Sequence, residues 1–345
     1  MSVSKTFFGT TRDGQAVDVF TLRCGAMEAE ILTFGATVRA LRVPDKDGRI
    51  VDVVLGYNSV HGYETNDGYL GALVGRYANR IAGASYMIDG ERIVLEANEG
   101  TKQLHGGFVG FSHRVFDAEI IAENAIRLRY TAADGEGGHP GNLTLCATYT
   151  LTENALVLRY EAESDKPTHC NITNHSYFNL NGHGDILDHK LQIFASRFTP
   201  VDENSIPTAM AVPVAGTAFD FTAEKTVGRD ISANEDQLRF TSGYDHNFVL
   251  DAMQGLRRAA RLIGNESGIV METWTEKPGV QLYCGNFLDA ANDTKSGKPY
   301  TKREALCLET QFFPDSPSHS DWGDIILRPG QRYDYTTEYR FSIAE

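Results

Sequence analysis

The sequence of 345 residues predicts an all-β protein, because three observations agree. Apolar and polar residues alternate with a period of two in many segments, and this places successive side chains on opposite faces of a strand. Clusters of Gly, Asn and Asp separate these segments at short intervals, as they do in hairpins. Segments with a helical period are sparse. We therefore expect a large antiparallel β-sandwich with little helix.

The middle of the chain contains the clearest strands. Residues 126–130, 143–151 and 156–162 each carry apolar side chains at every second position. In the first of these segments Ile126, Leu128 and Tyr130 share one face, and two arginines take the other. The pattern is typical of half-buried strands in antiparallel sheets. Turns are expected between strands at 45–48, 89–90, 98–100 and 152–154, where Asp, Asn and Gly cluster.

Residues 256–274 allow two interpretations. The segment 256–262 has the composition of a short amphipathic helix, but Asn-Glu-Ser-Gly at 265–268 is a turn that leads into an apolar run at 269–274. We interpret the segment as a hairpin of two strands. One helical turn is expected around Asn58 to Tyr63. The chain has no internal repeat and no linker-like change of composition, so we expect a single domain over residues 1–345.

Composition and charge argue against several classes of partner. The 46 acidic residues outnumber the 32 Lys and Arg, which gives a formal charge of −14. Nucleic acids and anionic membranes are therefore unlikely partners, because phosphate binding requires a basic surface. No stretch approaches the ~20 apolar residues that cross a bilayer. The polar first residues lack the apolar core of a secretory signal, and five scattered cysteines indicate free thiols. We expect a cytoplasmic protein.

The motif search leaves acid-base chemistry by side chains alone. No Gly-x-Gly-x-x-Gly opens a helix, and neither a phosphate-binding Gly-rich loop with Lys nor His-Glu-x-x-His is present. Histidines and cysteines are not paired at zinc spacing, and no Gly-x-Ser-x-Gly elbow marks a hydrolase. We therefore expect neither a metal nor a cofactor.

One imidazole and one carboxylate stand out. His175 lies in Thr-Asn-His-Ser-Tyr-Phe-Asn-Leu at 173–180, and Glu309 lies in Leu-Glu-Thr-Gln at 308–311. Such a pair can supply a general acid and a general base. Further polar clusters beside aromatic residues or glycines occupy 75–81, 103–107, 243–248 and 280–287. Amide and charged groups next to aromatic rings suit a neutral sugar, whose hydroxyls need hydrogen bonds and whose C–H face packs on a ring.

These segments resemble the aldose 1-epimerase, or galactose mutarotase, family. Each motif alone is weak, but together they follow the family order over nearly the full length. They are Phe-Gly-Ala at 34–36, Asn-Arg-Ile at 79–81, Leu-His-Gly-Gly at 104–107, Gly-Phe at 110–111, Pro-Gly-Asn-Leu at 140–143, residues 174–180, Phe-Thr-Pro-Val-Asp at 198–202, Tyr-Asp-His-Asn-Phe at 244–248, Gly-Asn-Phe-Leu at 285–288 and Glu-Thr-Gln at 309–311 with Phe-Pro-Asp-Ser-Pro at 313–317.

The resemblance implies a galactose mutarotase-like supersandwich in one domain. It also implies an isomerase that interconverts the α and β anomers of free hexoses such as D-galactose and D-glucose without a cofactor. By position His175 resembles the proton donor and Glu309 the proton acceptor, and His105 would lie beside the ring oxygen and the anomeric region. The residues expected to hold or line the sugar are Asn79, Arg80, Ser176, Tyr177, Asp245 and Gln281.

The chemistry fits these residue types without reference to the family. Ring opening needs a base at the anomeric hydroxyl and an acid at the ring oxygen, and closure on the other face of the aldehyde reverses both transfers. We expect Glu309 to act as a carboxylate and His175 as an imidazolium. Because an imidazole has a pKa near ~6.5, a neighbouring carboxylate would keep it charged near neutral pH.

Other interpretations remain open at this stage. A sugar-binding or sensing protein would have the pocket without turnover, although binding alone does not require both an acid and a base. An epimerase for hexose 6-phosphates would present several cations, and only Arg80 stands out here. Individually, Asn79 and Gln281 have a structural alternative in satisfying buried backbone groups. The sequence leaves open the preferred hexose and the choice between a monomer and a homodimer.

Overall fold

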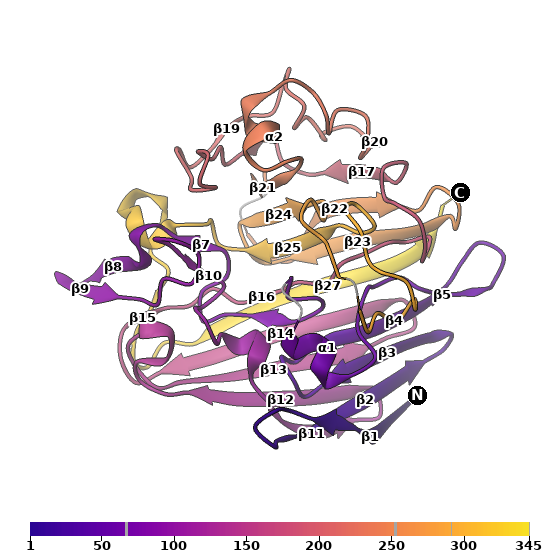
Figure 1. Ribbon diagram of the computed structural model, residues 1–345, viewed down its shortest axis with the longest axis horizontal. Helices are drawn as coiled ribbons and strands as arrows, with labels where there is room; N and C mark the ends of the chain where they lie inside the picture. Colours follow the sequence, from indigo (N-terminus) through magenta and orange to yellow (C-terminus); the bar gives the residue numbers. More distant parts are fainter. Residues whose placement is uncertain (66–67, 252–253, 291, 345) are drawn as a thin grey trace.

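The computed structural model describes residues 1–65, 68–251, 254–290 and 292–344, and strands dominate it (Figure 1). The largest unit is a nine-stranded sheet that extends from β11–β14 at the bottom of Figure 1 to β17 and β20 at the top. In spatial order its strands are β11 (Asp117–Ala122), β12 (Ala125–Ala132), β13 (Leu143–Leu151), β14 (Ala155–Ser164), β27 (Tyr333–Ile343), β23 (Ile269–Thr275), β22 (Arg257–Ile263), β17 (Lys190–Ile193) and β20 (Lys225–Thr226).

Two five-stranded sheets share a hydrophobic core with the large sheet. The first contains, in order, β1 (Ser2–Thr10), β2 (Ala16–Cys24), β3 (Met27–Leu32), β4 (Val38–Pro44) and β5 (Ile50–Asp52). The second contains β19 (Val212–Pro213), β18 (Arg197–Phe198), β21 (Asp245–Val249), β24 (Gly279–Tyr283) and β25 (Cys307–Gln311). One buried cluster joins Ile31, Leu158 and Leu282, one residue from each sheet. The predicted antiparallel β architecture with little helix is therefore confirmed.

Short two-stranded ladders carry the segments that connect the large sheets. They are β6 (Leu73–Val74) with β16 (Thr173–Asn174), β7 (Arg80–Ile81) with β10 (Gln103–Leu104), β8 (Ser85–Ile88) with β9 (Glu91–Val94), and β15 (Thr168–His169) with β26 (Ile326–Leu327). Three residues predicted for the site, Asn79, His105 and His175, lie at the ends of these ladders. The ladders therefore position part of the site.

Helix is scarce in the part of the chain that the structure describes. It consists of α1 (Val60–Thr65), α2 (Asp236–Phe240) and single 3₁₀ turns at Ala82–Ala84, Phe111–His113, Glu136–Gly138, Ser316–Ser318 and Ser320–Trp322. The turn expected at 58–63 is found two residues later as α1, and α2 was not predicted. No helix among the described residues is both long and apolar enough to span a membrane.

The predicted strands are found where the alternation is clearest. β13 alternates strictly between buried and half-buried residues, and β14 follows the same period. The ambiguous segment is the β22–β23 hairpin. Its register shifts between Arg258 and Ala260, so the neighbouring Ala259 and Ala260 are both buried. This bulge breaks the period of two and explains why the sequence also resembled a helix.

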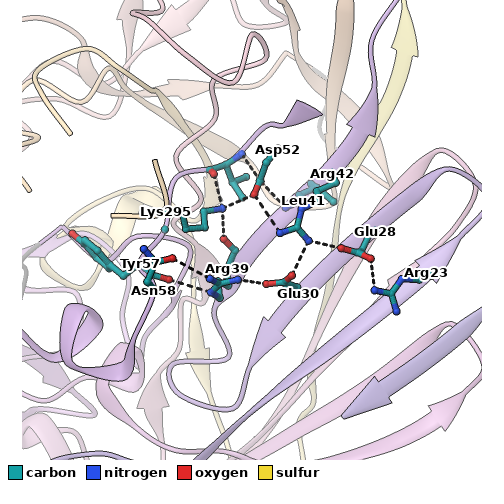
Figure 2. Close-up of polar contacts among 12 residues, drawn as sticks. Arg23, Glu28, Glu30, Arg39, Leu41, Arg42, Asp52, Tyr57, Asn58 and Lys295 are labelled. Carbon is teal, nitrogen blue, oxygen red and sulfur yellow. Dashed lines mark hydrogen bonds and ion pairs between the residues drawn. The ribbon is translucent and has the colours of Figure 1, made fainter. Parts of the chain in front are cut away.

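A network of charged groups fastens the loop around Lys295 to the first five-stranded sheet (Figure 2). The Lys295 ammonium donates to the carbonyl of Arg39 at 2.6 Å, to Asp52 Oδ2 at 2.8 Å and to the carbonyl of Val54 at 2.9 Å. From the sheet side the network continues through the ion pairs Arg39–Glu30, Arg42–Glu30, Arg42–Glu28 and Arg23–Glu28. Because Lys295 meets three acceptors, its buried charge is compensated.

Lys277 has a different environment, because it is fully buried without an ion pair to any described carboxylate. Its ammonium donates to the carbonyl of Ile172 and lies 5.3, 5.4 and 5.9 Å from the ring centres of Tyr160, Tyr333 and Tyr335. Burial lowers the pKa of Lys277 to about 7. The charge of this lysine therefore disappears near neutral pH in the folded protein.

This pKa predicts a pH-dependent stability. An unfolded lysine titrates near ~10.4, so between pH ~7 and pH ~10.4 the unfolded chain binds more protons and stability rises with pH. The contribution of Lys277 is about 1.4 kcal/mol per pH unit in that window. We expect Lys277→Met to remove this rise, measured as urea midpoints of both proteins near pH ~7 and pH ~9. The exposed Lys298→Met serves as the control, and an unchanged rise in Lys277→Met would contradict the prediction.

Candidate active site

One face of the β21–β24–β25 sheet is polar although it is buried. The register pairs Asn247 with Gln281 and Gln281 with Glu309, so their side chains share one face of the sheet. Residues two positions away on the same strands point to that face as well. They are Asp245, Tyr283, Cys307 and Gln311. The opposite face contributes Phe248, Val280, Leu282 and Leu308 to the core.

Amide side chains link the polar groups of this face. Gln281 donates its Nε2 to Asp245 Oδ1 at 2.7 Å. Gln311 donates its Nε2 at 3.2 Å to Gln281 Oε1 and at 3.2 Å to Asn247 Oδ1. Gln281 and Asp245, both predicted from the sequence, are therefore adjacent, and Gln311 holds Gln281 in place. Buried polar groups with satisfied hydrogen bonds give a fixed orientation.

His175 faces Glu309 across this site. It follows β16, where its backbone N–H donates to the carbonyl of Ala72 at 2.9 Å. His175 Nε2 lies 3.6 Å from Glu309 Oε1, and the two residues are only 5% and 2% exposed. Glu309 Oε2 has no hydrogen-bond partner among the described residues. The acid and the base predicted from segments 134 residues apart (309 − 175) are thus brought together.

His105 completes the group from a third segment. It lies in the turn after β10 with a φ of 54°, and its backbone N–H donates to the carbonyl of Asn79 at 3.1 Å. In return the backbone N–H of Asn79 donates to His105 Nδ1 at 3.1 Å. Nδ1 is therefore an acceptor, and a neutral ring carries its proton on Nε2. The ring centre lies 5.4 Å from that of His175.

The ligand atoms of these three residues lie farther apart than those around a tetrahedral zinc ion. Among the described residues, only His105, His175 and Glu309 form a group whose potential ligand atoms all lie within 4.8 Å of one another. Ligands of a tetrahedral zinc ion at 2.0–2.1 Å are separated by about 3.4 Å, which is less than this spread. This spacing does not fit a tetrahedral zinc ion.

Arg80 is fixed by a partner that the sequence did not reveal. Its Nε and Nη2 donate to the two oxygens of Glu99 at 2.7 and 2.9 Å, a bidentate ion pair. Lys102 adds a second cation at 3.2 Å from Glu99. The segment 98–100 was predicted only as a turn. The β7–β10 pairing brings its acid next to Arg80, and only this long-range pairing could have indicated the contact.

Tyr177 and Ser176 differ in how they contact the site: Tyr177 through its ring and Ser176 through its backbone. The Tyr177 ring stacks on His175 with centres 5.1 Å apart, so it forms the wall behind the imidazole. The Ser176 hydroxyl is buried and has no hydrogen-bond partner among the described residues. Its backbone N–H donates to Asn174 Oδ1 at 3.1 Å. Ser176 therefore contributes through its backbone position in this structure.

Tyr69 packs against two histidines of the site. Its ring centre lies 4.6 Å from that of His105 and 5.9 Å from that of His175. A cavity of about 370 Å³ borders it, and this volume lies within the range of small-ligand sites. The lining includes Tyr69, Asn98, Glu99, Leu104, Gly107 and Phe108, but not His105, His175 or Glu309. Tyr69 was not among the predicted residues, and its position next to the turn at Gly71 gave no signal.

Burial disfavours charge at both catalytic candidates. Burial lowers the pKa of His175 to about 4. Burial raises the pKa of Glu309 well above its usual range, and the nearby Asp245 adds to this while Arg80 opposes it. Burial also lowers the pKa of His105 well below its usual value, aided by the charges of His175 and Arg80. The expectation that Glu309 keeps the imidazole charged at neutral pH is therefore wrong, because burial of both groups favours their neutral forms and the sequence did not show how completely they are enclosed.

Sequence comparison with known proteins identifies similar proteins over nearly the full length of the chain. Residues 18–340 match the family model described as aldose 1-epimerase. The chain is 41% identical to galactose mutarotase of Rattus norvegicus over 347 aligned residues, which cover 100% of both chains. It is 40% identical to aldose 1-epimerase of Escherichia coli over 339 residues, covering 96% of this chain and 97% of that protein.

A solved structure agrees with the sequence comparisons. The crystal structure of galactose 1-epimerase from Lactobacillus acidophilus matches with a TM-score of 0.87 at 30% identity, and the match covers 100% of both chains. The fold, the family match and the full-length relatives therefore all indicate the same protein family.

Proposed function

Because the chain belongs to the aldose 1-epimerase family and therefore catalyses anomer exchange in aldoses, we propose that His175 and Glu309 perform the proton transfers on a bound hexose. Glu309 is the base at the anomeric hydroxyl, and His175 is the acid at the ring oxygen. The hexose is a free sugar such as D-galactose or D-glucose.

One observation carries the assignment of residues. An imidazole nitrogen and a carboxylate oxygen from distant segments lie 3.6 Å apart in an enclosed site, and the second carboxylate oxygen has no partner among the described residues. Sugar hydroxyls supply the hydrogen bonds that such a carboxylate lacks. Positioned acid and base groups are each worth roughly 10²- to 10⁴-fold in rate.

The proton balance fits the electrostatics of the site. The ion pair of carboxylate and imidazolium holds the same number of protons as the neutral pair. In ring opening Glu309 takes the O1 proton, His175 Nε2 gives its proton to O5, and the C1–O5 bond breaks to leave an aldehyde. Both residues end in the neutral form that burial favours. Burial therefore makes the carboxylate a stronger base and the imidazolium a stronger acid.

Rotation about C1–C2 then presents the other face of the aldehyde. Ring closure returns the O5 proton to His175, while protonated Glu309 gives its proton to the carbonyl oxygen. The residues end in their starting protonation state, so a single cycle needs no cofactor. Forming the ion pair before ring opening costs free energy, and hydrogen bonds from the sugar hydroxyls offset it.

The remaining polar groups are suited to holding hydroxyls. His105 presents Nε2–H, and Asp245 presents a carboxylate oriented by Gln281. Arg80, anchored on Glu99, and Asn79 complete the set. We assign these residues to sugar binding, and Tyr177 to the wall behind His175.

Polarimetry tests the activity. Freshly dissolved α-D-galactose should lose its excess rotation faster with the protein than without it, near neutral pH. Calorimetric titration with galactose runs in parallel. Binding of galactose without any acceleration would support a sugar-binding protein and contradict the assignment of turnover.

Glucose 6-phosphate is the matched competitor. Two donor groups of Arg80 are used by Glu99, which also pairs with Lys102, so the Glu99 carboxylate offsets part of the positive charge that a phosphate would need. We expect free glucose, but not glucose 6-phosphate at the same concentration, to compete with galactose. Stronger inhibition by the phosphate ester would favour an epimerase for hexose phosphates.

We further propose that residues 1–345 act as one catalytic domain in the cytoplasm, as a monomer or homodimer. Supporting observations are the family match over 18–340 and the five cysteines, all of which are free thiols. Free thiols are typical of reducing compartments.

A further inference from the structure

A buried thiol lies on the side of His175 that faces away from Glu309. Cys307 Sγ is 3.4 Å from His175 Nδ1, and the Cys307 residue is fully buried. Cys307 precedes Glu309 by two positions in β25, so both side chains leave the same face of the strand. One strand therefore presents a thiol to one nitrogen of the imidazole and a carboxylate to the other.

The protonation of this thiol decides which way the hydrogen bond runs. Burial raises the pKa of Cys307 well above its usual value, and Glu309 adds to the effect, so the group remains S–H. A thiol is a weak donor and its sulfur a weak acceptor, whereas an imidazole nitrogen with a lone pair is a good acceptor. The contact is therefore better satisfied by S–H donating to Nδ1 than by Nδ1–H pointing at sulfur.

We propose that Cys307 is a positioning residue that donates its S–H to His175 Nδ1 and thereby keeps the ring proton on Nε2, the nitrogen that faces Glu309. The inference rests on the proposed role of His175 as the acid. In the resting neutral ring Nε2–H then points into the site as a hydrogen-bond donor. The imidazolium that acts as the acid carries a proton on each nitrogen, and transfer of the Nε2 proton to O5 leaves the remaining proton on Nδ1, facing the sulfur.

The same contact affects the basicity of His175. Protonation of the neutral ring takes place at Nδ1, which must then give up the S–H hydrogen bond and face a weak acceptor. Cys307 therefore opposes the charged form. The other titratable or aromatic groups that face His175 are Glu309, His105, Tyr69, Tyr177 and Tyr283. At Nδ1 itself the neighbour is the Cys307 thiol.

Nuclear magnetic resonance of ¹⁵N-histidine protein tests the contact without reference to activity. The signals of His175 are those missing from the His175→Gln spectrum. We expect wild type to show the Nε2–H tautomer with a hydrogen-bonded Nδ1. In Cys307→Ala the Nδ1 signal should move to the position of a free acceptor, or the Nδ1–H tautomer should appear. Cys307→Ser, which keeps a donor, should restore the wild-type pattern.

The matched control is Cys284→Ala. Cys284 is also fully buried, and it has no contact with His175 among those described. The substitution removes the same atoms from the core, so an effect that comes only from lost packing should appear in both alanine variants. His175 signals that are equal in wild type and Cys307→Ala, or a wild-type ring protonated at Nδ1, would overturn the proposal.

Kinetics provide a second readout. We expect the acid limb of the kcat profile to move upward by roughly 0.5 to 1 pH unit in Cys307→Ala, because His175 becomes easier to protonate. Cys307→Ser should leave the limb unshifted or lower it. If Cys307 does not donate to His175, mutarotation should stay intact and the acid limb of the kcat profile should not move in any Cys307 variant. If instead the proposed function is wrong, the wild-type protein should not accelerate anomer exchange, while the magnetic resonance experiment would still report the contact between Cys307 and His175.

Discussion

Glu309→Gln should lower kcat for anomer exchange by roughly 10²- to 10⁴-fold, because the amide cannot accept the O1 proton. Sugar affinity should change little. Glutamine has the same size as glutamate, retains a carbonyl acceptor, and is neutral, which suits a site where burial raises the pKa of Glu309. Polarimetry gives kcat, and calorimetric titration with galactose gives the dissociation constant.

Glu163→Gln is the control for this variant. Glu163 lies exposed on β14, so the same chemical change should leave kcat and affinity unaltered. The assignment of the base is wrong if Glu309→Gln loses sugar binding but preserves the turnover of each bound molecule. In that case Glu309 would hold a hydroxyl, and the nearest carboxylate on the same face, Asp245, would become the candidate base.

His175→Gln should cause a loss of similar size. The amide nitrogen of glutamine reaches the region of Nε2 and keeps a hydrogen-bond donor, but it has no proton that can be released to O5. The double variant with Glu309→Gln should be little worse than the poorer single variant, because both transfers belong to one step and residues that act as a unit are not additive. The rates come from the same polarimetric assay.

The exposed His61→Gln controls for the substitution itself. Turnover that survives in His175→Gln would shift the role of acid to His105, whose Nε2 also faces the site. Full additivity of the two single losses would indicate that the residues act in separate steps. Either result would change the proposed mechanism without changing the fold or the family.

The sequence predicted the parts of the fold that repeat a simple period. Strands such as β13, with apolar side chains at every second position, followed directly from alternation. The five-residue helix α2 was missed because one turn of helix has too few positions to establish a period. The β22 bulge blurred the same signal locally.

For the site, the motifs indicated the side chains but not their environment. His175 and Glu309 were predicted, yet their separation and enclosure depend on how β16 and β25 meet in the core. Glu99 was missed because its contact with Arg80 arises from strand pairing rather than from sequence neighbours. Cys307 had a signal: it lies two residues before Glu309 in a strand, and therefore on the same face.

The shared face of β21, β24 and β25 has a consequence for how such a protein can change over time. Insertion of one residue within β25 would turn the Glu309 carboxylate into the apolar interior and bring Leu308 to the sugar. Changes in length are therefore tolerable only outside these strands, for instance in the segment of 23 residues between Tyr283 and Cys307. New sugar preferences should arise by exchanging side chains at fixed strand lengths, while the loops vary in size.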